Sequence, residues 1–123
     1  MEEPKGRNMT VRRIVANIET PDPGKARAFY GELLGLKIVM DHGWIVTFAD
    51  DGKAAPQVSF ASEGGGGSPV PDLSIEVDDV DETYARVIAA GLEIVRTLSD
   101  EPWGVRRFFV RDPFGKIVNI LSH

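Results

Sequence analysis

The chain repeats part of its own sequence, and this repeat limits the possible folds more than any other feature. The segment GLKIV at residues 35–39 returns as GLEIV at residues 91–95, and Ile-Glu at residues 18–19 returns at residues 75–76 at nearly the same spacing. Several matches in the same order at one spacing indicate an internal duplication. Two copies are too few for a solenoid, so the sequence predicts a pair of like modules.

We expect a single domain over residues 11–122, after a flexible polar tail at residues 1–10. The first module covers residues 11–61 and the second covers residues 71–122. Between them, residues 62–70 contain four consecutive glycines. Glycine loses much backbone entropy on ordering, so we expect this segment to be a flexible linker. Such a linker leaves open whether the modules pair within one chain or exchange between two chains.

Each module reads as strand, helix, strand, strand, strand. Period-two alternation and turn residues place the strands at 11–19, 36–40, 44–49 and 57–61 in the first module, and at 73–77, 92–97, 105–111 and 117–121 in the second. Asp22 and Asp81 are expected to cap the two helices, and Gly35 and Gly91 to end them. The helical residues expected to pack on the sheet are Ala26, Phe29, Tyr30 and Leu33 in the first helix and Tyr84, Val87 and Ile88 in the second.

This pattern predicts an α+β fold in which two tandem βαβββ modules form a curved, mostly antiparallel sheet with helices on the outer side. Alternation assigns the apolar residues Ile14, Ala16, Ile18, Val58, Phe60, Leu73, Ile75, Val77, Val118 and Ile120 to the helix side. The opposite face is mixed and polar, and carries Arg13, Val15, Asn17, Gln57, Ser59, Asp72, Ser74, Glu76 and Asn119. We expect these residues to line a ligand-binding cleft. The alternative is that they form an ordinary solvated sheet face.

Composition excludes several classes of protein. The chain has no cysteine, which excludes a disulfide framework, a cysteine–zinc site and a thiol nucleophile. A formal net charge of −5 argues against nucleic-acid binding. The sequence has neither an apolar run of the ~20 residues that span a bilayer nor the apolar centre of a signal peptide. We therefore expect a cytoplasmic protein that binds neither nucleic acid nor membrane.

Two motifs resemble those of the vicinal oxygen chelate superfamily, which includes glyoxalase I, extradiol dioxygenases, fosfomycin-resistance enzymes and bleomycin-resistance proteins. Residues 29–36 (FYGELLGL) resemble its FY-x-x-xLGL segment. Trp103-Gly104 and residues 108–116 (FFVRDPFGK) resemble its second signature, a WG pair followed by an aromatic strand and DP-x-G. The resemblance covers about residues 11–122 and implies the paired βαβββ fold. Fold alone does not determine the reaction.

The resemblance also implies four metal-ligand positions. Catalytic members hold a divalent metal with His, Gln or Glu side chains from four strands. Those positions fall here on Val15, Ser59, Asp72 and Asn119. Valine has no donor atom, and hydroxyl and amide oxygens are weak ligands for transition metals. We therefore expect no catalytic metal and no cofactor.

Three functions remain open. The first is a metal-free protein of the bleomycin-resistance type that sequesters a small molecule, with Trp44 and Trp103 as aromatic walls of the cleft; the alternative for these tryptophans is packing in the core or at a dimer interface. The second is an enzyme with a divergent metal site: a lyase, isomerase or dioxygenase. The third is a stress-associated or partner domain whose cleft is vestigial. The charge of the ligand also stays open. Asp72, Glu76 and Glu19 favour a cation, whereas Arg13, Arg106 and Arg107 favour an anionic group.

Two further expectations concern the histidines and the quaternary structure. His42 and His123 lie in a predicted hairpin tip and at the last residue, away from the cleft set, so we expect no catalytic role for them. Single modules have exposed sheet edges, which natural proteins pair or cover. Members of the family commonly dimerise, so we expect a homodimer.

Overall fold

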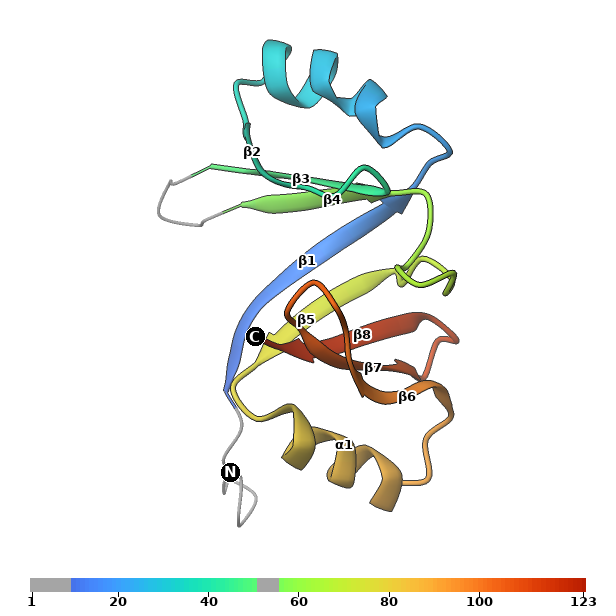
Figure 1. Cartoon of the computed structure of the whole chain (residues 1–123). Coiled ribbons are helices and arrows are strands. Elements are labelled where there is room, and N and C mark those ends of the chain that lie inside the picture. The colour runs from blue at the N-terminus through green and yellow to red at the C-terminus, as the bar shows by residue number, and fades with distance from the viewer. Residues whose placement is uncertain (1–9, 51–55) are drawn as a thin grey trace. The chain divides into compact units, whose positions relative to one another are not determined.

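The computed structural model describes residues 10–50 and 56–123. Its strands form a mixed sheet in the hydrogen-bonded order β2-β3-β4-β1-β5-β8-β7-β6 (Figure 1). The strands are β1 (Val11–Glu19), β2 (Lys37–Asp41), β3 (Ile45–Ala49), β4 (Gln57–Ala61), β5 (Leu73–Val77), β6 (Ile94–Asp100), β7 (Arg106–Arg111) and β8 (Ile117–Ser122). The α+β class and the strand-rich plan of the sequence analysis are confirmed. The expected tail at residues 1–10 lies outside the described residues except for Thr10, whose N–H donates to Asp78 Oδ1 at 2.7 Å.

The chain divides into two compact units, which are described one at a time. The N-terminal unit is Val15–Leu73. The C-terminal unit consists of Ser74–His123 together with the start of the chain as far as Ile14. Each unit contains a helical segment and three antiparallel strands that follow it in sequence, β2 to β4 in the first and β6 to β8 in the second.

In the N-terminal unit the antiparallel strands β2, β3 and β4 are joined by a parallel pairing of β4 with β1. The core of this unit contains Val46, Phe48 and Phe60, against which Tyr30 packs. The Tyr30 ring centroid lies 4.7 Å from that of Phe60. Val58 and Phe60 therefore face the helical segment, as alternation along β4 predicted.

The helical segment of this unit differs from the expected single α-helix. It consists of a 3₁₀ turn, η1 (Pro23–Lys25), followed by a π-helix, η2 (Arg27–Leu33). Phe29 and Leu33 were expected to pack on the sheet, but they are 52% and 70% exposed. The wider i→i+5 turn of a π-helix changes which side chains share a face. Tyr30 remains on the inner side.

The structure confirms some of the residues predicted to begin and end the helices. Asp22 stands before η1 as expected, but its side chain makes no capping hydrogen bond. Gly35 has a φ of +78° after η2, and Gly91 has a φ of +72° after the second helix. These positive values are the left-handed conformation that glycine favours at a helix end, so both predicted helix ends are confirmed.

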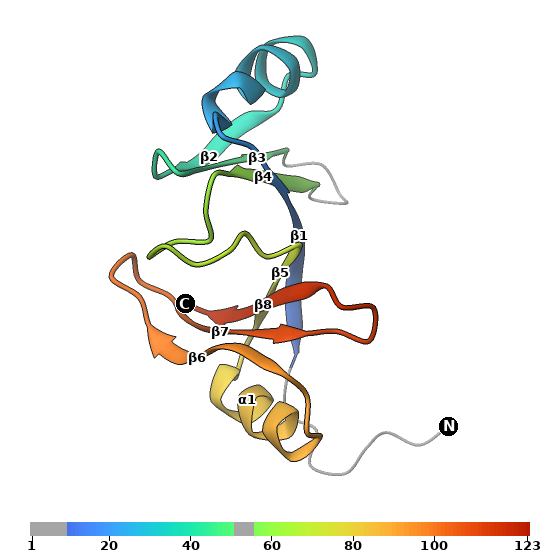
Figure 2. The ribbon, with the colours of Figure 1, turned by 90° about the vertical axis from the view of Figure 1, so that its right-hand side faces the viewer.

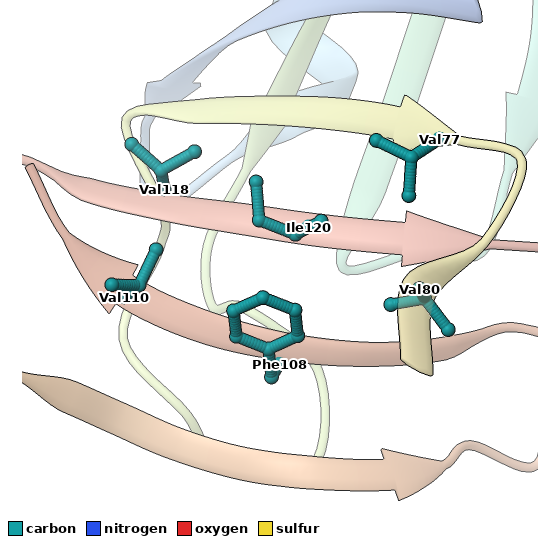
Figure 3. Close-up of a cluster of buried hydrophobic side chains, with 6 residues drawn as sticks. All are labelled: Val77, Val80, Phe108, Val110, Val118 and Ile120. Atoms are coloured by element: carbon teal, nitrogen blue, oxygen red, sulfur yellow. The ribbon is translucent and has the colours of Figure 1, made fainter. Parts of the chain in front are cut away.

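In the C-terminal unit the helix α1 (Val80–Ala89) contacts β6, β7 and β8. Figure 3 shows the core beneath it, formed by Val77, Val80, Phe108, Val110, Val118 and Ile120. Tyr84 and Val87 of α1 and Ile75 of β5 pack against this cluster, as predicted. Figure 2 shows α1 lying along one side of β6 and β7.

The capping residue of α1 is Asp79, not Asp81. Asp79 Oδ1 accepts a hydrogen bond from the Glu82 N–H at 3.0 Å. Asp81 lies in the first turn, where its carboxylate pairs with Arg106 at 2.9 Å. The run of acidic residues before the helix offers several caps, and burial of Val80 selects the earlier one. Ile88, expected to pack, is half exposed because it falls outside the α1 stripe that meets the sheet.

Three further residues expected on the helix side of the sheet are exposed. Ile18 pairs in register with Phe60 but is 45% exposed, and Ala16 and Ile14 are also exposed. The reason is that the principal helix contacts are with β3 in one unit and with β6, β7 and β8 in the other, and β1 is not among them.

The glycine-rich segment contains a hydrogen-bonded turn. The Gly64 N–H donates to the Ser68 carbonyl at 2.8 Å, and the Gly67 N–H donates to Glu63 Oε1 at 2.8 Å. Gly65, Gly66 and Gly67 have φ values of 93°, 62° and 78°. Three consecutive residues in the left-handed region favour glycine strongly, because a side chain there would clash with the backbone. The glycines therefore allow this turn to form.

Candidate functional site

The face of the C-terminal unit opposite α1, called here the α1-distal face, carries a row of functional side chains. Along β7, Phe108 and Val110 point into the core under α1. Their neighbours Arg107 and Phe109 therefore point to the other side. Phe109 stands opposite Arg96 on β6 and opposite Asn119 on β8. Residues directly opposite in antiparallel strands share a face, so these three side chains form one row.

A buried ion network stands beside this row. Glu101 Oε2 accepts from Arg107 Nη2 at 2.8 Å, and Glu101 Oε1 accepts from Arg96 Nη2 at 3.0 Å. The side chains of Glu101 and Arg107 are only 5% and 4% exposed, whereas Arg96 keeps 30% of its surface. The Ser99 hydroxyl lies 3.3 Å from Glu101 Oε1. One carboxylate thus contacts two guanidinium groups.

Two aromatic rings flank the buried guanidinium. The Arg107 Cζ lies 4.9 Å from the ring centroid of Trp103 and 4.8 Å from that of Phe109. Desolvation lowers the pKa of Arg107, and the charge of Arg96 acts in the same direction while Glu101 opposes both. Burial by itself would raise the pKa of Glu101, but its hydrogen bonds and ion pairs with the two arginines outweigh burial and lower it.

Asn119 is the most informative predicted site residue in this unit. Its side chain is buried, and its Nδ2 donates to the Ser74 hydroxyl at 3.1 Å. Its Oδ1 is also buried, and no hydrogen-bond donor reaches it among residues 10–50 and 56–123. A buried acceptor without a donor costs free energy, so such atoms usually mark the place of a water or ligand.

Two predicted residues of this unit pair with each other. Arg13 Nε lies 2.5 Å from Glu76 Oε1, and Arg13 Nη2 lies 3.2 Å from His123 Nε2. His123 was expected to lie away from the site residues, but it contacts one of them. The reason is that the end of the chain continues β8, which brings the last residue to the start of the chain. The paired charges of Arg13 and Glu76 offset each other.

The N-terminal unit holds a second polar group. Ser59 Oγ lies 2.7 Å from Thr47 Oγ1, and both residues are buried. Asn17 stands opposite Ser59 in the parallel β1–β4 pair. Val15 is buried as well, and it offers no polar atom.

Of the remaining predicted residues of the N-terminal unit, Asp72 contacts Asn17, and Trp44 and Gln57 lie near strand ends. Asp72 is exposed and precedes β5, and its carbonyl accepts the Asn17 N–H at 3.0 Å. Trp44 stacks on His42 with ring centroids 6.0 Å apart, at the turn between β2 and β3. Gln57 stands opposite Ala49 at one end of β4. The predicted site residues are thus divided between the two units.

Sequence reasoning missed several members of these groups. Arg96, Glu101, Phe109 and Thr47 were not among the predicted site residues. Alternation along residues 106–111 (RRFFVR) puts Arg107 and Phe109 on one face, and that signal was available. Glu101 gives no such signal, because it lies between β6 and β7.

A family model described as Glyoxalase/Bleomycin resistance protein/Dioxygenase superfamily matches residues 12–120. The chain belongs to this superfamily. Among curated proteins, an uncharacterised protein of Mycobacterium bovis, Mb0911c, is 37% identical over 78 residues, which cover 60% of this chain and 49% of that protein. An uncharacterised protein of Mycobacterium tuberculosis, Rv0887c, is also 37% identical over 78 residues, which cover 60% of this chain and 44% of that protein. The chain therefore spans about half the length of the curated relatives it matches.

Solved structures of the superfamily fold resemble this chain. An NAD-dependent benzaldehyde dehydrogenase from Legionella pneumophila has a TM-score of 0.71 at 18% identity, covering 89% of this chain and 98% of that one. A superfamily member from Vibrio splendidus has a TM-score of 0.65 at 21% identity, with coverage of 92% and 98%. The methylmalonyl-CoA epimerase of Mycobacterium tuberculosis has a TM-score of 0.61 at 18% identity, with coverage of 91% and 86%. At these identities the likeness concerns the fold alone.

The residues at the four implied metal positions do not suit a transition metal. Val15 has no donor atom, Ser59 is engaged by Thr47, and Asn119 offers only an amide oxygen. No group of three or more His, Cys, Asp or Glu side chains comes together within the described part of the chain. Within the same residues, no helix is long and apolar enough to cross a membrane.

Proposed function

We propose that this superfamily member binds a small organic molecule on the α1-distal face of its C-terminal unit, without a metal. The observation that carries the proposal is the buried Asn119 Oδ1, which has no donor partner in the described chain. Leaving such an acceptor unsatisfied costs about 1–3 kcal/mol, and a ligand N–H or O–H removes that cost. The Asn119 Nδ2 donates to the Ser74 hydroxyl, which leaves Oδ1 as the amide atom without a partner among the described residues.

The surroundings of Asn119 are aromatic. Phe109 stands opposite it across the strand pair but is completely buried, so Trp103 is the nearby ring that keeps some exposure. Trp103 is held near the same face by its contact with Arg107. Apolar walls with a few fixed polar atoms are the usual composition of small-molecule sites. No general acid, base or nucleophile is needed for this role, so we assign binding and not catalysis.

The test is a thermal-shift screen of the full chain with small aromatic compounds that carry a hydrogen-bond donor, with and without EDTA. A ligand that binds only the native state raises the melting temperature by mass action. We expect stabilisation that EDTA leaves unchanged. Asn119→Leu should remove the stabilisation, whereas Ser122→Leu, on the other face of β8, should retain it.

Two results would contradict the proposal. One is stabilisation that appears only after addition of Mn²⁺, Ni²⁺, Zn²⁺ or Fe²⁺, together with turnover of a methylglyoxal–thiol adduct or a catechol. That result would establish the divergent metal-dependent enzyme instead. The other is the absence of any stabilising compound across cationic, neutral and anionic members of the screen.

A further inference from the structure

The outer side of η2 carries an apolar patch, called here the η2 patch, which consists of Phe29, Leu33 and Leu34. These side chains are 52%, 70% and 56% exposed. Phe29 and Leu33 are about one helical turn apart, so they lie on the same side of the segment. Exposed apolar side chains that gather on one face are characteristic of surfaces that bind another molecule.

The inner side of η2 is already packed, so the patch cannot turn inward without displacing the core. Tyr30 and Ala26 pack against the buried cluster of the N-terminal unit. The π-helical geometry of η2 places Tyr30 inward and leaves Phe29 and Leu33 outside. Turns of this kind are rare and occur frequently at functional sites. The outward position of the patch is therefore a property of the backbone geometry, and it leaves a surface for a partner.

Two charged residues beside the patch indicate the nature of the partner. Lys25 and Glu32 are exposed, and neither makes a hydrogen bond or ion pair within residues 10–50 and 56–123. Lys25 stands three residues before Ala28, and Glu32 stands three residues after Phe29. The two charges are thus placed symmetrically about the midpoint between Ala28 and Phe29.

This symmetry makes the segment complementary in charge to a copy of itself. When two copies pack antiparallel about a two-fold axis at the midpoint, Lys25 of each copy lies opposite Glu32 of the other. A parallel arrangement would instead place like charges opposite each other, which is unfavourable. Arg27 does not disturb this pattern, because Asp41 of the same chain pairs with it at 2.6 Å.

We propose that the η2 patch is the contact surface between two copies of this chain, with η2 of one copy antiparallel to η2 of the other. Burial of the apolar side chains drives the association, and the two Lys25–Glu32 pairs set its orientation. Phe29 of each copy lies next to the small, exposed side chain of Ala28 in the other copy. A two-fold contact closes on itself, so it gives a dimer and not a growing assembly.

The test exchanges the two charges and measures the dissociation constant of the dimer by analytical ultracentrifugation of the full chain. Lys25→Glu and Glu32→Lys each place like charges opposite each other, so each should raise the dissociation constant at least ~tenfold. An equimolar mixture of the two variants should restore the dimer, because every substituted position then faces the opposite charge. Native mass spectrometry, with one variant labelled with ¹⁵N, should identify the restored species as the heterodimer.

Two further variants separate the role of the patch from a general effect of charge or folding. Lys116→Glu makes the same change of charge at an exposed residue between β7 and β8, and it should leave the dissociation constant unchanged. Phe29→Ala removes apolar surface from the patch without a change of charge, and it should weaken the dimer. If either charge variant does not fold, as judged by circular dichroism, Phe29→Ala decides whether the η2 patch is the interface.

Three results would overturn the proposal. They are a wild-type chain that stays monomeric at micromolar concentration, a dimer that none of the three η2 variants weakens, and a mixture of the charge variants that stays monomeric. The contact residues belong to the N-terminal unit and the proposed ligand site to the C-terminal unit, so loss of the dimer and loss of ligand binding are distinguishable.

Discussion

At the scale of single residues, the α1-distal face is organised by Glu101. This carboxylate is buried, yet it accepts hydrogen bonds from Arg96 and Arg107 on two different strands. Burial of a charge is unfavourable unless partners replace the lost water. The network therefore stabilises the fold only as a complete set, and removal of one member leaves the others buried with unmatched charge.

Glu101→Gln should accordingly destabilise the protein strongly. Breaking a buried ion pair by removing one partner costs about 3–5 kcal/mol, because the remaining charge stays buried. The matched control is Glu82→Gln, which breaks the more exposed Glu82–Arg86 pair on α1 and should cost about 0.3–0.5 kcal/mol. Urea unfolding followed by circular dichroism measures both changes. Equal losses in the two variants would show that the buried network contributes no more than a surface pair.

The Glu101 carboxylate also makes the free energy of unfolding depend on pH in the acid range. The pKa of Glu101 lies below its ordinary value of 4.5 in the folded protein, because its pairs with the two arginines outweigh the cost of burial. A lowered pKa contributes stability that is fully present above the unfolded value and is lost as pH falls through the folded value. We expect the free energy of unfolding to decrease below about pH 4.5. In Glu101→Gln that decrease should be smaller, and an unchanged acid dependence would assign it to other carboxylates.

At the scale of elements, two neighbouring aspartates at the start of α1 make different interactions. Asp79 caps the helix through the Glu82 N–H, whereas Asp81 binds Arg106. Both are aspartates near the helix start, and the sequence alone favoured the second as the cap. Which one lies at the N-cap depends on where burial of Val80 begins the helix, and that is a tertiary effect.

Asp79→Ala should therefore cost more stability than Asp81→Ala. Loss of an N-cap aspartate typically costs about 1 kcal/mol, since an orphan N–H of the first turn loses its acceptor. The Asp81–Arg106 pair lies at the surface, so it contributes less than the cap, and salt reduces its contribution further. Denaturant midpoints of the two variants at low and high salt measure both contributions. A larger loss for Asp81→Ala at high salt would contradict the assignment of the cap.

Alternation predicted the faces of the strands better than helical spacing predicted the faces of the helices. The assignments of Val58, Ile75 and Val118 to the helix side are confirmed, because side chains in a strand must alternate whatever lies around them. The assignments of Phe29 and Leu33 were wrong, because they assumed 3.6 residues per turn and the segment forms a π-helix.

At the scale of the whole molecule, membership of the superfamily establishes the fold but not an activity. The solved structures with this fold include a protein named as a dehydrogenase and one named as an epimerase, both at 18% identity. The resemblance to catalytic members implies metal-ligand positions at Val15, Ser59, Asp72 and Asn119, which are not the usual His, Gln or Glu ligands. Function must therefore be argued from the site and not from the fold.

The exposed apolar side chains of the N-terminal unit lead to a prediction about assembly. Phe29, Leu33 and Leu34, together with Ile38 and Val39 of β2, remain exposed. Because so much exposed apolar surface is unusual for a monomer, we expect a homodimer that covers part of it. Light scattering at micromolar concentration should give twice the chain mass for the wild type and the monomer mass for Leu33→Glu. Ile88→Glu, on the exposed side of α1, is the control and should stay dimeric.

Residue pattern alone was enough to predict the duplicated plan, the faces of most strands and the superfamily. These properties depend on local periodicity and on which residue types are present. The contacts of Glu101 with Arg96 and Arg107, and the buried acceptor of Asn119 beside Ser74, arise only in the folded chain. Those contacts join residues on separate strands and turns, so they depend on strand register and burial, which no local pattern in the sequence specifies.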